Sequence, residues 1–230
     1  MGIHKVDDII IYTNSALFDG VCHGENIEKE IAEWIVDHYE YNIILDILNK
    51  NYEGLTEEDK KEIIYSVINS LEFDRDTREK KIENCLKNYL KTENEINLQG
   101  FVRFRLREYR SELERVIDDT VGEYIVEREY FAFIDLLKEF VSYQPAIFKA
   151  MEVYVSENDV VYKNEKGEDV KDYIEENVFF DGDLTNEDKL LTTLVTIAPE
   201  KVSIRFHKEY ENEEIKRTIK LIFGERVKFL

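Results

Sequence analysis

The sequence contains few of the residues that interrupt or crosslink a polypeptide. Its 230 residues include two prolines, nine glycines and two cysteines. Cys22 and Cys85 lie far apart and lack the spacing of a metal site, so we expect two reduced thiols. Neither a P-loop nor a dinucleotide-binding glycine motif is present. We therefore expect no disulfide and no bound cofactor.

Catalytic and metal-binding patterns are also missing. The four histidines have neither the spacing of a metal site nor a place in a recognisable catalytic triad. Cys22 and His23 are adjacent, but they fall in a segment that we interpret as a loop, and neighbouring side chains rarely point at each other. We expect no catalytic residues and no metal ligands.

Long apolar runs and an excess of positive charge are absent as well. No run is long enough to cross a membrane, and the first residues lack the apolar segment of a signal peptide. We therefore expect a cytoplasmic protein without a membrane partner. The net charge of −20 repels nucleic acid phosphates and favours a protein partner that is itself basic. No feature specifies an oligomeric state.

What is present predicts an α+β fold with a border near Pro145. Hydrophobic residues make up 43% of the chain, which is enough for a globular core. Residues 1–145 show mainly helical periodicity, with a short strand predicted at 8–12, and residues 146–230 mix strands with helices. We expect the two parts to pack as one compact unit.

The helical part is predicted to be a bundle that ends in a long helical hairpin. Apolar periodicity predicts helices over residues 27–48, 56–71 and 75–91. Residues 98–144 are almost all compatible with helix, which is too long for one helix in an ordinary globular domain. Gly122 is the weakest helix former near the middle of this stretch, so we place a break there.

The second part is predicted to contain a small mixed sheet. Residues 152–155 and 160–162 alternate like strands and flank a turn, which predicts a β-hairpin. A short helix is expected over 170–177, and Thr185 resembles the N-cap of a longer one. Residues 202–206, 213–223 and 226–229 read as strand, helix and strand, which favours a parallel crossover.

Positive charge is concentrated in one segment. Residues 101–115 hold five of the eleven arginines, namely Arg103, Arg105, Arg107, Arg110 and Arg115. On a continuous helix Arg103, Arg107 and Arg110 share one face, and Arg105 points roughly opposite. Guanidinium groups bind carboxylates and phosphates through planar, multidentate contacts that lysine does not match. The segment is therefore either a hub of ion pairs within the fold or a binding site for an anion.

Two interpretations of this segment stay open. Arginines often cover the edge of a core while they pair with acids of neighbouring helices. The acids considered for such pairs are Glu127, Glu129, Asp135 and Glu139. Alternatively, the arginines hold the phosphate or carboxylate of a small molecule. Binding of a nucleic acid duplex is disfavoured, because interleaved glutamates reduce the net charge of residues 101–115 to +2.

Negative charge is densest in residues 157–188, which carry a net charge of −9. Asp181, Gly182 and Asp183 look like the start of a calcium loop, but the glycine is in the second position instead of the sixth. Thr192 also stands where such a loop needs a glutamate. We expect a solvated acidic rim.

Several segments together resemble a known family. Residues 99–109, with the run from Gln99 to Tyr109, resemble the central signature of the YtxC-like sporulation proteins of spore-forming bacteria. Residues 129–137 and 190–201, followed by 222–227, resemble further signatures of that family in the same order. The resemblance extends from about residue 27 to the end of the chain. It implies a link to sporulation, and it implies no activity, substrate or catalytic residue.

Two functions follow as hypotheses. The first is a non-enzymatic cytoplasmic protein that acts in a sporulation-related process through a protein partner. The second is a sensor or enzyme that binds an anionic metabolite. The residues that would form its site are Arg103, Arg105, Arg107 and Arg110. Guanidinium groups that are neutralised within the fold favour the first function, and unpaired ones that converge on an open cavity favour the second.

Overall fold

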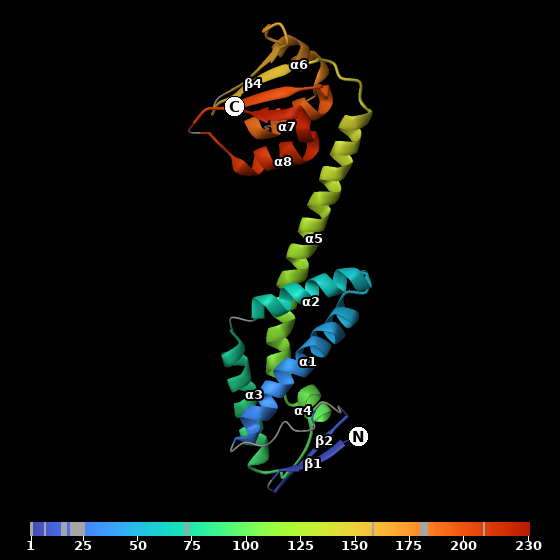
Figure 1. Ribbon diagram of the computed structural model, residues 1–230, viewed down its shortest axis with the longest axis vertical. Coiled ribbons are helices and arrows are strands. Elements are labelled where there is room, and N and C mark those ends of the chain that lie inside the picture. The colour runs from blue at the N-terminus through green and yellow to red at the C-terminus, as the bar shows by residue number, and fades with distance from the viewer. Residues whose placement is uncertain are drawn as a thin grey trace. The chain divides into compact units, whose positions relative to one another are not determined.

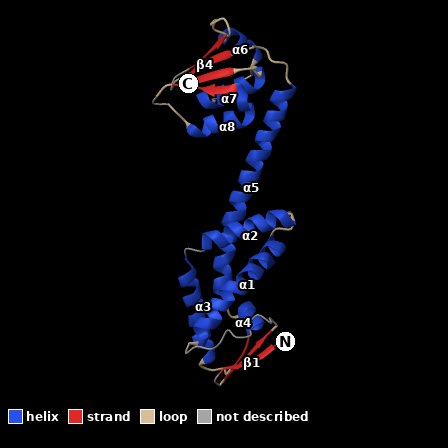
Figure 2. Ribbon diagram, in the orientation of Figure 1, coloured by secondary structure: helices blue, strands red, loops and turns tan. Residues whose placement is uncertain are grey.

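The computed structural model describes residues 2–6, 8–14, 18, 26–71, 74–157, 159–179, 184–208 and 210–230. The chain forms two compact units, Met1–Val126 and Glu127–Leu230 (Figure 1). Each unit contains helices and a small sheet (Figure 2), which confirms the α+β class. The predictions for Cys22, His23 and residues 181–183 fall outside the described residues.

The first unit contains a three-stranded sheet in the order β1-β2-β3. β2 (Ile9–Thr13) is the predicted strand, and it pairs antiparallel with β1 (Gly2–Val6) and parallel with β3 (Glu95–Asn97). The two outer strands were not predicted from the sequence. β3 has only three residues, and β1 follows no strict alternation of apolar and polar residues.

Three of the predicted helices are confirmed in this unit: α1 (Ile27–Asn51), α2 (Glu57–Leu71) and α3 (Arg75–Leu90). Their starts follow from local capping. The side chain of Asn26 accepts the backbone N–H of Lys29, and Thr56 and Asp59 exchange hydrogen bonds of 2.8 and 3.1 Å ahead of α2. Apolar side chains of α1, α2 and α3 form one core with residues of β2, of α4 (Leu98–Phe104) and of α5 (Arg107–Tyr143).

The predicted hairpin with a break near Gly122 is wrong. α5 (Arg107–Tyr143) runs through Gly122 without interruption, and the chain breaks instead at Arg105 and Leu106, after α4 (Leu98–Phe104). Glycine costs a helix interior only about 1 kcal/mol relative to alanine, which is too little to end a long helix. The break at Leu106 lets α4 lie against β2 and β3 while Leu106 itself is buried.

The border between the units differs in position from the one that the sequence indicated. It lies within α5, between Val126 and Glu127, whereas the sequence placed it near Pro145. The expectation that both parts pack as one compact unit stays a prediction. No helix in the described part of the chain combines the length and the apolar character of a membrane span.

The second unit is built on a four-stranded sheet in the order β5-β4-β6-β7. The predicted hairpin is confirmed as β4 (Met151–Val155) and β5 (Val160–Asn164), which are antiparallel. β6 (Val202–Phe206), α8 (Glu213–Phe223) and β7 (Val227–Phe229) form the predicted strand–helix–strand unit, with the two strands parallel.

Two more helices complete the second unit, α6 (Lys171–Asn177) and α7 (Asn186–Ile197). α7 begins with the predicted cap, because Thr185 and Asp188 form a reciprocal capping box. One face of the sheet is buried, through Met151, Val153 and Val155 of β4. Side chains of α7, of α8 and of the C-terminal part of α5 belong to the same core.

A candidate anion-binding cleft

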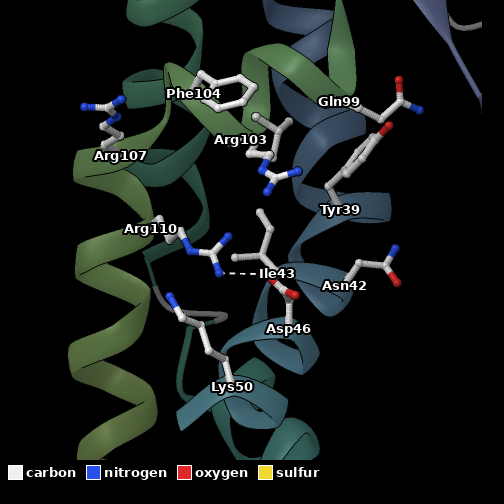
Figure 3. A pocket seen from close by; sticks show the side chains of 11 residues that line it. Tyr39, Asn42, Ile43, Asp46, Lys50, Gln99, Arg103, Phe104, Arg107 and Arg110 are labelled. Carbon is white, nitrogen blue, oxygen red and sulfur yellow. Dashed lines mark hydrogen bonds and ion pairs between the residues drawn. The ribbon is translucent and has the colours of Figure 1, made fainter.

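An open cleft of about 760 Å³ lies in the first unit, between α1, α4 and α5 (Figure 3). We call it the arginine cleft. It is lined by Tyr39, Asn42, Ile43, Asp46 and Lys50 of α1, by Gln99, Val102, Arg103 and Phe104 of α4, and by Arg107 and Arg110 of α5. Three of the four arginines that the sequence singled out therefore line one cavity.

The lining of the arginine cleft is cationic although the chain is acidic. It holds three arginines and Lys50 against one carboxylate, that of Asp46, which leaves an excess of three positive charges. Arg110 donates through Nη2 to Oδ2 of Asp46 at 2.7 Å, and its Nε lies 3.8 Å from Oε1 of Glu114. Arg110 is thus neutralised within the fold.

Arg103 and Arg107 are not neutralised in this way. Both side chains are exposed, and neither forms an ion pair with a carboxylate among the residues that the structure describes. The guanidinium of Arg103 lies 5.6 Å from the centre of the Phe104 ring, a cation–π contact that leaves its charge in place. In Figure 3 Arg103 and Lys50 extend toward Arg110, and the head group of Arg107 points away from them at the edge of the cleft.

Arg105 lies apart from the other three. Its guanidinium stacks over Tyr89 at 5.5 Å from the ring centre, beside a smaller cleft of about 380 Å³. Arg107 and Phe104 line both clefts, so they stand on the ridge between them. Arg105 stands at the break between α4 and α5, as the C-cap residue of α4. On the continuous helix that the sequence predicted, Arg105 points roughly opposite to Arg103, Arg107 and Arg110.

The acid that neutralises Arg110 was not among those considered from the sequence. It is Asp46 of α1, instead of Glu127, Glu129, Asp135 or Glu139. A signal for this wall of the cleft was present in the sequence. Asn42, Asp46 and Lys50 follow each other at four-residue spacing, which places three polar side chains on one face of α1. Asp46 and Arg110 are 64 residues apart, so their pairing depends on how α1 packs against α5.

A buried polar cluster holds α5 against α1 beside the cleft. Arg78 of α3 donates through Nε to Oε1 of Glu40 at 2.7 Å, and Tyr109 of α5 donates its hydroxyl to the same carboxylate. All three residues are buried. Burial, together with the negative charge of Glu40, raises the pKa of Tyr109 far above its ordinary value. Because Tyr109 lies between Arg107 and Arg110 in the chain, this cluster determines where α5 begins relative to α1.

The lining of the arginine cleft contains no serine, threonine, cysteine or histidine. Its groups of a type that can act as a nucleophile or transfer a proton are Tyr39, Asp46 and Lys50. Arginine stays protonated at any physiological pH and transfers no proton. In the described part of the chain, no group of three or more His, Cys, Asp or Glu side chains is placed to hold a metal ion. The half-buried thiol of Cys85 is free, and burial raises its pKa.

Comparison with known proteins places the chain in a family. The family model described as the YtxC-like family matches residues 25–228. A protein of Bacillus subtilis (strain 168) named "Uncharacterized protein YtxC" is 24% identical over 219 residues, which cover 89% of this chain and 76% of that protein. No solved structure matches the chain.

Proposed function

This chain belongs to the YtxC-like family, and we propose that it is a binding protein that holds an anionic small molecule in the arginine cleft. The observation that carries this proposal is the exposed guanidinium group of Arg103, which has no acidic partner among the described residues and extends toward Arg110 and Lys50 in an open cavity, with Arg107 at its edge. Such groups bind phosphate or carboxylate through several hydrogen bonds at once.

The electrostatics of the cleft support an anionic ligand. Two like charges about 4 Å apart repel each other by roughly 1 kcal/mol in water and by about 4 kcal/mol near a protein surface. Arg103 and Lys50 extend toward Arg110 (Figure 3), so an anion placed among these three groups would reduce the repulsion between them. Lys50 adds a fourth positive charge to the same lining. Asp46 is the acid among the described residues that line the cleft.

The size and lining of the cleft indicate the class of ligand. Its volume of about 760 Å³ is in the range of small-molecule sites, roughly 300–1,000 Å³. Ile43 and Val102 form buried apolar parts of the wall, and the ring of Phe104 is exposed. A phosphorylated or carboxylated metabolite that also carries an apolar or aromatic part fits this lining better than a bare ion.

We propose that the ligand is bound without being converted, since the lining contains no serine, threonine, cysteine or histidine. We also propose a cytoplasmic, sporulation-related role, which is supported by the resemblance of residues 99–109 and 129–137 to sporulation proteins. A basic protein partner, as the acidic composition favours, would contact a different surface, because the cationic cleft would repel it.

Thermal unfolding in the presence of nucleotides and phosphorylated or carboxylated metabolites tests this function. Trp34 is the only tryptophan and lies in the first unit, so its fluorescence follows the unit that contains the cleft. A ligand at 100 times its Kd stabilises by about 2.7 kcal/mol, which raises Tm by several degrees. Arg103→Gln should abolish the rise for the ligand that is found.

Arg115→Gln is the matched control, because Arg115 is an exposed arginine of α5 that does not line the cleft. This variant should keep the full response. A flat response across the whole panel would contradict the proposal, and so would a rise that survives Arg103→Gln unchanged.

A further inference from the structure

The second unit carries a band of exposed apolar side chains on α5. The exposed fractions are 54% for Phe133, 61% for Leu136, 50% for Phe140 and 80% for Tyr143. We call these four residues the apolar band. They follow one another at intervals of three, four and three residues, so they lie on one side of the helix. Soluble proteins rarely expose so many large apolar side chains together without a binding role.

The apolar band is distinct from the side of α5 that packs within its own unit. Ile134 and Val141 are buried in the core of the second unit, and the hydroxyl of Tyr130 lies 2.8 Å from Oγ1 of Thr218 on α8. Residue 134 is rotated by about 100° from Phe133 on a helix. The core of the unit therefore uses one side of α5, and the apolar band is left over beside it.

The spacing of the band indicates the shape of its partner. Intervals of three and four residues are those of the a and d positions in a coiled coil, and a second amphipathic helix offers the complementary row of apolar side chains. A strand, with its period of two, cannot follow the same row. The band extends over 11 residues, about one and a half heptads, so we expect an interface at the small, transient end of the usual range.

The charge around the band indicates the sign of the partner. Residues 127–143 contain four acids and two bases, which gives this part of α5 a net charge of −2. Glu129 continues the row of the band, four residues before Phe133, and Glu139 precedes Phe140. Basic side chains that flank an apolar row would pair with these acids and would be attracted by the net charge of −20.

We propose that the apolar band is the docking site for a basic amphipathic helix of another protein. A second copy of the chain fits less well, because two molecules of net charge −20 repel each other and bring the same acids together. A bilayer also fits less well, because anionic headgroups repel an acidic helix. The inference concerns the second unit alone and is independent of any ligand in the arginine cleft.

Two designed peptides test the proposal on the full chain. Both have three heptads with leucine at the a and d positions, and they differ only in the flanking residues, which are lysine and arginine in one and glutamate in the other. Fluorescence anisotropy of each labelled peptide is recorded against the protein. The basic peptide should bind with saturation, and the acidic peptide should bind at least tenfold more weakly.

Substitutions locate the site. Leu136→Glu should weaken the basic peptide at least tenfold, although the added negative charge alone would strengthen it. Ser142→Glu introduces the same charge on α5 outside the row of the band, about 120° around the helix from Leu136. Ser142 donates to the carbonyl of Glu139, and this variant should bind at least as well as the unmodified chain. Tyr143→Ser is a second, milder variant of the band, and circular dichroism checks that each protein is folded.

Several results would overturn the proposal. Equal binding of both peptides, or binding that neither Leu136→Glu nor Tyr143→Ser reduces, would exclude a basic helix on the band. A dimer in analytical ultracentrifugation that Leu136→Glu dissociates would show that a second copy occupies it. Sedimentation with phosphatidylglycerol vesicles that the same variant abolishes would assign the band to a lipid surface.

Discussion

Arg78 on α3 and Glu40 on α1 form a bidentate ion pair, with Nε–Oε1 and Nη2–Oε2 distances of 2.7 and 3.3 Å, and both side chains are buried. Arg78 also donates to the carbonyl of Leu71, and Tyr109 donates to Glu40. Four helices, α1, α2, α3 and α5, thus contribute to one polar cluster in the core of the first unit. A buried pair of this kind adds little over well-packed apolar residues, but the removal of one partner leaves an uncompensated charge.

We expect Glu40→Gln to destabilise the first unit by about 3–5 kcal/mol, because Arg78 would stay buried without its counter-charge. Urea unfolding followed by the fluorescence of Trp34 measures this loss. Glu112→Gln is the matched control, since Glu112 binds Lys81 at the same distance of 2.7 Å while both side chains are about half exposed. Glu112→Gln should lower the free energy of unfolding by less than about 1 kcal/mol. Equal losses in the two variants would show that burial does not set the cost.

The raised pKa of Tyr109 predicts how the free energy of unfolding changes at alkaline pH. Burial, and then the charge of Glu40, raise the pKa of Tyr109 far above 10, so the folded chain keeps the phenolic proton while an unfolded tyrosine loses it near pH 10. Above pH 10 the unfolded state binds fewer protons than the folded state, and stability falls as the pH rises. Tyr109 contributes about 1.4 kcal/mol to this fall by pH 11.

Tyr109→Phe removes that contribution, so its stability should fall less steeply between pH 10 and 11, even though the variant is less stable at pH 7. Urea unfolding at half-unit intervals of pH measures both slopes. Tyr65→Phe, on the exposed side of α2, controls for the loss of one hydroxyl group. Parallel curves for the unmodified chain and Tyr109→Phe would contradict the assignment.

The course of α5 illustrates what the sequence could and could not predict. Helices with local caps, such as those after Thr56 and Thr185, follow from residues three positions apart and were predicted correctly. The break at Leu106 has no such local signal. It depends on the position of the first sheet, against which α4 packs, and β2 and β3 of that sheet pair residues 85 positions apart in the chain.

Gly122→Ala should stabilise the protein by about 0.5–1 kcal/mol, because glycine inside a helix loses backbone entropy that alanine does not lose. Gly122 is exposed, and a Cβ atom added there would meet no atom within 4 Å. Thermal unfolding of the variant measures the gain. Gly224→Ala is an instructive contrast, because Gly224 has a φ of +54° and the same change there should destabilise. A loss of stability in Gly122→Ala would indicate that α5 is not continuous.

The arginine cleft could also be predicted only in part, because some of its features are local in the sequence and others depend on residues far apart in the chain. The concentration of guanidinium groups in residues 101–115 is visible in the sequence, and so is their sign against an acidic background. Which of them are neutralised is not visible, because the acids come from elsewhere in the chain. Asp46 neutralises Arg110 across 64 residues, while Glu40 neutralises Arg78 across 38. Periodicity along one helix contains no information about these partners.

Asp46 provides the sharpest test of the cleft. It contributes the carboxylate of the lining and pairs with Arg110, so Asp46→Asn raises the excess charge of the cleft from +3 to +4 and frees one guanidinium. We expect pyrophosphate, as a probe anion, to bind about three- to tenfold more tightly, which corresponds to about 1 kcal/mol for a partly exposed charge. Titration calorimetry measures the change, and 200 mM salt should reduce it relative to 50 mM, since salt screens exposed charges.

Asp119→Asn is the control: it removes an exposed acid of α5 outside the cleft and should leave the affinity for pyrophosphate nearly unchanged. Because the pair of Asp46 with Arg110 is exposed, stability should change by less than about 1 kcal/mol, so tighter binding cannot be attributed to a change in folding. Weaker binding of pyrophosphate to Asp46→Asn would mean that the carboxylate orients Arg110 for the ligand rather than competing with it, and that the cleft is not governed by its net charge.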